Sequence, residues 1–102
     1  MILEKCGESL EIEGRVFTIG DRVLSVDDSE YGKLYGTILE IRTDPDKDTE
    51  NEGPDIYVCF DEPEDEKLIK ELEVRFSELY REPKTIDEIG IDLVIMAPEE
   101  FI

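Results

Sequence analysis

The chain lacks histidine and tryptophan, and it has only two cysteines in its 102 residues. Without histidine it has no side chain whose ordinary pKa lies near neutral pH, and no imidazole ligand for a metal ion. The sequence also lacks a nucleophile elbow, a phosphate-binding loop and a dinucleotide fingerprint. We therefore expect a protein that is not an enzyme and that needs no cofactor.

Long apolar runs are missing too, so no segment has the length and hydropathy of a membrane span. The first ten residues carry Glu4, Lys5 and Glu8 and lack the apolar stretch of a signal peptide. These features predict a cytoplasmic location. Cys6 and Cys59 are then expected to be reduced thiols rather than a disulfide.

Basic residues are scarce: 11 Lys and Arg face 29 Asp and Glu, which gives a net charge of −18. The acids are unevenly distributed, because residues 43–63 hold eight acids and one lysine, whereas residues 15–42 are nearly neutral. Such a charge repels phosphate backbones and anionic lipid. We expect a protein partner with basic character and no direct binding to nucleic acid or membrane. A merely solvated acidic surface is the alternative interpretation.

The first 60 residues have the pattern of a strand-rich core, over 8–60. Residues 8–13 alternate apolar and polar side chains, and residues 15–19 resume after Gly14, which predicts a hairpin. Two β-rich runs, 22–26 and 37–42, flank a turn-rich loop. Residues 56–60 are almost continuously apolar, which predicts a central strand buried on both faces.

An amphipathic helix is predicted over 64–81, where proline and acids favour the first turn. Val74 lies outside its apolar stripe, whereas a competing strand interpretation through Val74 leaves other apolar residues unexplained. The stripe comprises Leu68, Leu72, Phe76 and Leu79, widened by Ile69 and Tyr80. A short capped turn at 85–88 and a last strand at 91–96 complete a region that spans 85–97. The sequence thus predicts a single α+β domain over 1–102, with a small, strongly bent antiparallel sheet and one packed helix.

A glycine and valine pattern adds a resemblance. Gly20-Asp21-x-Val23-x-x-Val26, then Gly32, then Gly36-Thr37-Ile38-x-x-Ile41 resembles small Src-homology-3-like barrel modules of the Tudor and KOW type. The resemblance covers about a quarter of the chain and implies an open β-barrel. The whole chain also resembles uncharacterised short acidic proteins of bacterial mobile elements, which implies no activity.

The chain departs from these modules in ways that bear on function. RNA-binding KOW modules are basic, whereas this chain is acidic, and peptide-binding Src-homology modules use a tryptophan that is absent here. Tudor-type recognition of methylated side chains needs an aromatic cage. Tyr31, Tyr35 and Tyr57 would form one only if their rings converge.

The best candidate contact surface is the loop that contains Tyr31 and Tyr35. Tyrosines offer a large contact area at low entropic cost, and Asp27, Asp28 and Glu30 beside them would pair with a basic partner. The function predicted is non-catalytic binding of another protein, as an accessory module. The alternative role for the two tyrosines is structural, as covers on the sheet.

The alternative function is mimicry of nucleic acid. Residues 44–66 hold eleven acids and one lysine, and acids spaced along a surface can imitate phosphates and block a DNA- or RNA-binding protein. Such mimicry needs an ordered array of carboxylates. Pro45 and Pro54 in the loop do not favour one.

The acids of this loop also match the ligand spacing of an EF-hand. Thr49, however, occupies the position where the sharp turn requires glycine, and the flanking segments are predicted strands. We therefore assign no metal site, and binding of a divalent cation by the 44–55 loop remains an open alternative. The matching residues are Asp44, Asp46, Asp48, Glu50, Glu52 and Asp55.

Overall fold

The computed structural model describes residues 1–26 and 31–102, and its centre is a pair of antiparallel strands. β5 (Tyr35–Arg42) pairs with β6 (Asp55–Phe60) along nearly its whole length, with one register shift between Ile38 and Glu40. On one face Ile56, Val58 and Phe60 are at most 2% exposed, and on the other face Tyr57 is 5% exposed while Cys59 is half-buried. The predicted central strand is therefore present, between β5 and β7 (Val94–Met96).

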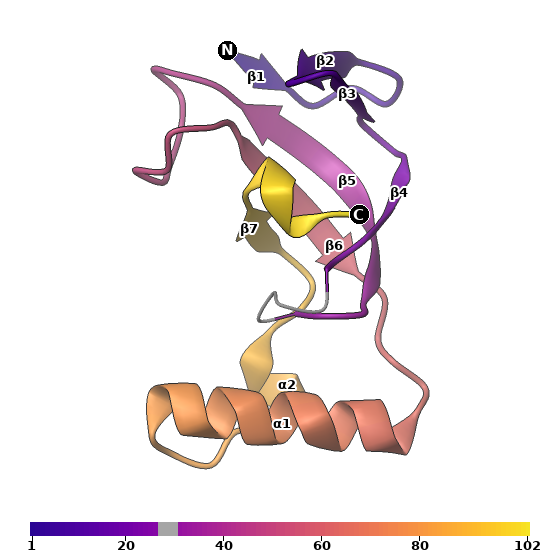
Figure 1. The fold of residues 1–102 in the computed structure, drawn as a ribbon, viewed down its shortest axis with the longest axis vertical. Helices are drawn as coiled ribbons and strands as arrows, with labels where there is room; N and C mark the ends of the chain where they lie inside the picture. The colour runs from indigo at the N-terminus through magenta and orange to yellow at the C-terminus, as the bar shows by residue number, and fades with distance from the viewer. Residues whose placement is uncertain (27–30) are drawn as a thin grey trace.

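The main sheet is antiparallel, with the order β1-β5-β6-β7 and with β4 paired to the other end of β5. β1 (Ile2–Leu3) and β4 (Arg22–Leu24) are short. The predicted hairpin forms a separate two-stranded sheet of β2 (Ser9–Ile12) and β3 (Arg15–Thr18) (Figure 1). Among the described residues the sheets are not closed into a barrel, so the barrel detail of the prediction is not confirmed.

The end of the chain returns to β4. After β7, a short 3-10 helix, η1 (Pro98–Glu100), leads to Phe101, which is 2% exposed and forms a bridge with Ser25. The amide of Val26 donates to the carbonyl of Glu100 at 2.8 Å. The guanidinium of Arg15 donates to the Phe101 carbonyl at 2.9 Å and ties the hairpin to this segment.

The helix predicted over 64–81 is α1 (Glu66–Tyr80). The Asp65 side chain accepts a hydrogen bond from the amide of Lys67, which is the contact expected of an N-cap residue. Leu72 and Phe76 are each 1% exposed, whereas Val74 is 58% exposed, as the stripe predicted. Leu79 and Tyr80 differ from the prediction, with 52% and 59% exposure, because the last turn of α1 extends past the sheet (Figure 1).

A second, short helix, α2 (Ile86–Ile89), packs beside α1. It is the predicted capped turn, closed by Gly90 at φ 70°. The capping contact differs from the expected capping box, since the Thr85 hydroxyl donates to the Glu88 carboxylate at 3.1 Å rather than accepting from the backbone.

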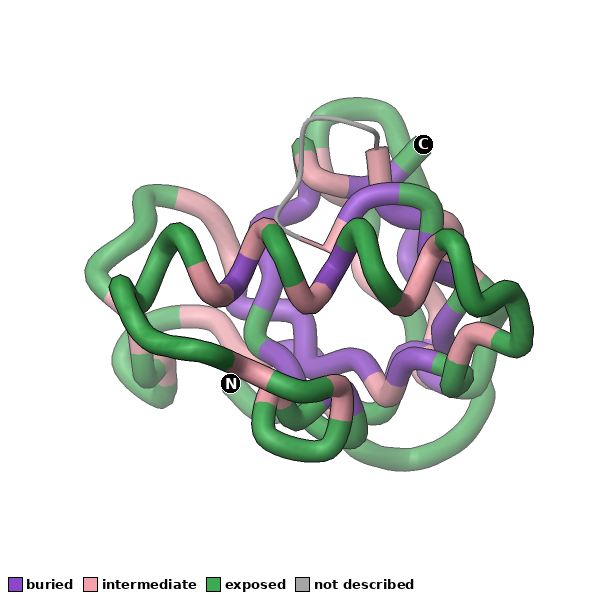
Figure 2. Tube along the Cα trace, turned by 90° about the horizontal axis from the view of Figure 1, so that it is seen from below, coloured by how far each residue is buried: buried purple, intermediate pink, exposed green. Residues whose placement is uncertain are grey.

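The core lies between the inner face of the main sheet, the returning C-terminal segment and α1. Figure 2, viewed from below, shows buried positions along the strands and on the side of α1 that faces them. Gly36 is required at this packing, because a Cβ there would lie 2.6 Å from Val58 Cγ1 and 2.9 Å from the Cys59 carbonyl oxygen. Cys59 lies half-buried, and both cysteines are unpaired.

Candidate partner-binding surface

Tyr31 lies between the sheet and the helix. Its ring stacks on Phe60, with centroids 5.5 Å apart, and contacts Phe76 at 5.0 Å. Its carbonyl oxygen accepts a hydrogen bond from the hydroxyl of Ser25, a fully buried side chain. The Tyr31 ring therefore contacts both β6, through Phe60, and α1, through Phe76, and the residue is of intermediate exposure.

Tyr35 is the exposed tyrosine of the predicted loop, at 57% exposure. It begins β5, and its carbonyl oxygen accepts a hydrogen bond from the Asp61 amide at 2.8 Å. This bond continues the β5–β6 ladder by one residue and places the acidic segment 61–65 beside the tyrosine. Residues 33–35, 61–65 and Leu68 together line a surface hollow of about 190 Å³.

The other three predicted contact residues, Asp27, Asp28 and Glu30, lie outside the described residues. They precede Tyr31 in the chain.

The carboxylates around the hollow fall into two groups. Asp61 accepts hydrogen bonds from both terminal nitrogens of Arg22, one at 3.0 Å, and this contact lowers the pKa of Asp61 below its ordinary value. Asp65 caps α1. Glu62 and Glu64 are exposed and form no hydrogen bond or ion pair with the described residues. These two carboxylates are available to a ligand.

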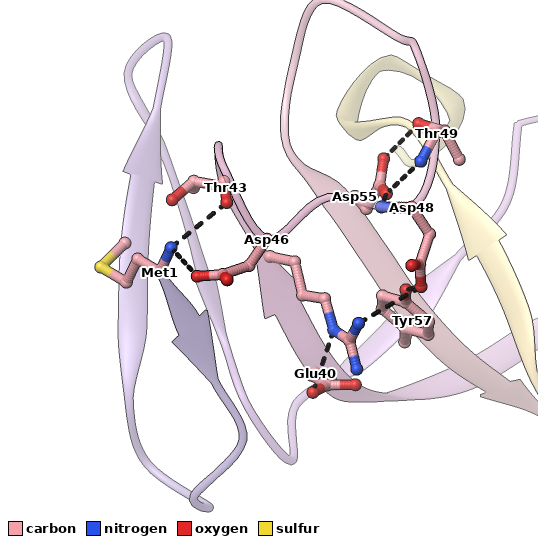
Figure 3. A network of polar contacts seen from close by, with 9 residues as sticks. Met1, Glu40, Thr43, Asp46, Asp48, Thr49, Asp55 and Tyr57 are labelled. Carbon is pink, nitrogen blue, oxygen red and sulfur yellow. Dashed lines mark hydrogen bonds and ion pairs between the residues drawn. The ribbon is translucent and has the colours of Figure 1, made fainter.

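The acidic loop of the EF-hand pattern is held together by its own acids (Figure 3). Asp46 accepts a hydrogen bond from the amino group of Met1 at 2.5 Å. Asp55, at 1% exposure, accepts from the amides of Asp48 and Thr49 at 2.8 and 2.9 Å, and from the Thr49 hydroxyl. Burial opposes ionisation of Asp55, but these hydrogen bonds outweigh it, and its pKa is lowered.

Asp48 points to a different set of groups. Its carboxylate accepts hydrogen bonds from the Tyr57 hydroxyl and, at 3.3 Å, from Arg42 (Figure 3). Asp46, Asp48 and Asp55 therefore contact separate protein groups instead of sharing one centre. Among the described residues, no cluster of three or more histidine, cysteine or acidic side chains could hold a metal ion. Three of the six acids in the EF-hand spacing, Asp46, Asp48 and Asp55, thus contribute to the structure of the loop.

The three tyrosines considered for an aromatic cage contact other groups rather than one another. Tyr57 is 5% exposed, with the guanidinium of Arg42 centred 5.0 Å from its ring centroid. Burial, together with the hydrogen bond to Asp48, raises the pKa of Tyr57 to about 12. Tyr31 packs in the aromatic contacts described above. Within the described chain, no ring contact joins Tyr31, Tyr35 and Tyr57 to one another.

Sequence reasoning treated the tyrosine loop and the acids after residue 60 as rival sites, and the structure brings them together. The signal was present in the strand pattern. If 37–42 and 56–60 pair as antiparallel neighbours with Gly36 opposite Phe60, then Tyr35 must face Asp61. The almost continuous apolar run at 56–60 has no alternation to select one register over another, so the combined surface was missed.

No family model, curated protein or solved structure matches this chain. In the described parts of the chain, no helix combines the length and the apolar character that a membrane crossing requires.

Proposed function

We propose that this chain is a non-catalytic protein-binding module, and that the surface around Tyr35 binds a partner through a basic segment. One observation carries the proposal: an exposed tyrosine shares a hollow with two carboxylates, Glu62 and Glu64, that no described residue engages. Tyrosine is enriched among residues that dominate binding energy, because its ring supplies a large contact area with little entropy to lose.

The charge of the molecule supports a basic partner. A net charge of −18 attracts cationic surfaces from a distance and speeds their encounter. The hollow then offers short-range contacts where the approaching segment docks. Long-range attraction and a local aromatic contact act on different steps, the first on association and the second on dissociation.

Mimicry of nucleic acid has less support. Asp46, Asp48 and Asp55 bond within the loop, Asp61 pairs with Arg22, and Asp65 caps a helix. Fewer carboxylates of the 44–66 region then remain free to imitate a row of phosphates. The protein-binding interpretation needs only the two free carboxylates and the tyrosine.

We also infer that the main sheet is a very open relative of the small Src-homology-3-like barrel. Support comes from the path of the chain, which leaves β7 through η1 and then places residues 100–102 beside β4. The segment after β7 thereby links β7, at one end of the sheet, to β4, which pairs with β5. A small barrel requires such a return.

Capture from lysate tests the binding function. Immobilised wild-type protein and the Tyr35→Ala variant are compared for the proteins they retain, with Tyr80→Leu as a matched control. Tyr80 is a similarly exposed tyrosine, at 59%, and does not line the hollow. We expect a basic protein retained by the wild type and the control but lost with Tyr35→Ala. Equal retention by all three would contradict the proposed surface.

A further inference from the structure

The chain holds two of its own cations by one repeated arrangement, a tyrosine ring with carboxylates. The Arg42 guanidinium lies 5.0 Å from the Tyr57 ring centroid, and it contacts Glu40 at 3.2 Å and Asp48 at 3.3 Å. The ring quadrupole and the carboxylates attract the same cation, and the two attractions reinforce each other. An arginine thus occupies a site made of one ring and two carboxylates.

The second instance holds a lysine. The ammonium of Lys84 lies 5.2 Å from the Tyr80 ring centroid and 2.7 Å from the Glu82 carboxylate. Here one ring and one carboxylate suffice. The two cations differ in shape, since a guanidinium presents several donors in a plane and an ammonium is a compact point charge.

The hollow at Tyr35 has the same components without the cation. Its ring is 57% exposed, and Glu62 and Glu64 contribute two carboxylates with no partner among the described residues. No described lysine or arginine lies over this ring, although three such cation–ring contacts occur elsewhere in the described chain. The set of groups matches the Arg42 site, with one ring and two carboxylates.

We propose that this hollow binds a single arginine side chain of the partner, with the guanidinium against the Tyr35 ring and paired to Glu62 and Glu64. The inference rests on the proposed binding function and names the chemistry of its anchor. The volume of about 190 Å³ lies below the roughly 300–1,000 Å³ of small-molecule sites, so a side chain fits better than a free ligand. The apolar walls at Pro63 and Leu68 suit the methylene stem of arginine.

Lys33 is the internal competitor. It lines the same hollow, and its ammonium reduces the attraction that an incoming guanidinium experiences. Its side chain forms no ion pair or ring contact with the described residues, so the ring remains accessible. Replacing Lys33 by alanine should therefore tighten arginine binding.

Three capped pentapeptides test the anchor directly: Gly-Gly-Arg-Gly-Gly and its lysine and citrulline counterparts. Each is titrated into the full chain at low salt, and binding is followed by NMR shifts of the Tyr35 ring and of the Glu62 and Glu64 amides. We expect the arginine peptide to bind about two- to fivefold more tightly than the lysine peptide, and neutral citrulline to produce no saturable shift.

Variants locate the site. Tyr35→Leu keeps apolar volume but removes the ring quadrupole, and it should weaken the arginine peptide by about two- to fivefold. The double change Glu62→Gln and Glu64→Gln should abolish the preference for arginine over lysine. Glu50→Gln with Glu52→Gln alters the net charge equally at two exposed acids away from the hollow, and it should leave the preference intact.

Two results would overturn the proposal: equal affinity for the arginine and lysine peptides, or shifts that map away from Tyr35. If Tyr35→Ala loses the lysate partner but the arginine and lysine peptides bind equally well, the arginine anchor is rejected and the binding function is retained. A third result is possible, in which wild type and Tyr35→Ala retain the same lysate proteins while the hollow still prefers the arginine peptide. That result would reject the binding function as proposed and retain the arginine site.

Discussion

At the scale of single residues, buried Asp55 shows how an acid-rich sequence uses a carboxylate for structure. Its oxygens accept three hydrogen bonds from the loop that follows β5, and so a charged side chain at 1% exposure is satisfied. Hydrogen bonds to the ionised form stabilise it, which is why the pKa of Asp55 is lowered. The loop depends on that charge.

Asp55→Asn should destabilise the fold by about 2–3 kcal/mol at neutral pH, because an amide accepts these bonds more weakly and adds donors that lack partners. A lowered pKa contributes stability that is present above the ordinary carboxyl pKa and is lost as pH falls through the lowered value. The deficit of the variant should therefore shrink in acid. Urea unfolding at pH about 7 and about 3 measures it, with Glu50→Gln as an exposed control. A deficit of equal size at both pH values would contradict the role of the charge.

At the scale of elements, α1 shows which helical side chains carry stability. Leu72 is 1% exposed and Val74 is 58% exposed, although only one residue separates them in the chain. Leu72→Ala should cost about 2–5 kcal/mol as a truncation in a packed core. Val74→Ala should cost less than about 0.5 kcal/mol, as is usual at the surface. Chemical denaturation compares the two, and equal losses would contradict the observed face of the helix.

The loop between β5 and β6 gives a second prediction at this scale. Asp46 already contacts the amino group of Met1, and Asp48 contacts the Tyr57 hydroxyl and the Arg42 guanidinium. Asp55 accepts hydrogen bonds from two backbone amides. Calcium would have to displace these partners in order to gather the three carboxylates. We expect millimolar calcium to change the melting temperature no more than magnesium at matched ionic strength. A calcium-specific rise that Asp48→Asn removes would contradict this assignment.

At the scale of the whole molecule, the sequence predicted what depends on neighbours in the chain. The alternation before Gly14 and the stripe through Leu72 and Phe76 are local, so the hairpin and the helix follow from spacing. The directions of the loop acids, and the meeting of Tyr35 with Asp61, depend on strand register and folding of the whole chain. The spacing of the loop acids therefore suggested a calcium site, although their side chains point to different groups. It also placed Tyr35 and the acids after residue 60 in two separate candidate sites, although they line one hollow.

The charge of the whole molecule leads to the last prediction, on the kinetics of partner binding. A chain of net charge −18 should steer a basic partner toward it, and salt should slow association because the Debye length is only about 8 Å at physiological ionic strength. Surface plasmon resonance with the captured partner separates the steps. Tyr35→Ala should speed dissociation about tenfold with little salt dependence, because it removes a short-range contact.

Glu62→Gln with Glu64→Gln should also speed dissociation, because the bound guanidinium loses its carboxylates. Unlike Tyr35→Ala, this pair should in addition slow association by about two- to tenfold and flatten its salt dependence, since these are the free carboxylates at the hollow. Asp61 and Asp65 are left unchanged because one pairs with Arg22 and the other caps α1. The Glu50→Gln and Glu52→Gln pair makes an equal change of net charge at distant exposed positions, so it should slow association less. Equal slowing by both pairs would mean that total charge alone attracts the partner, and an unchanged dissociation rate in Tyr35→Ala would move the contact to another face.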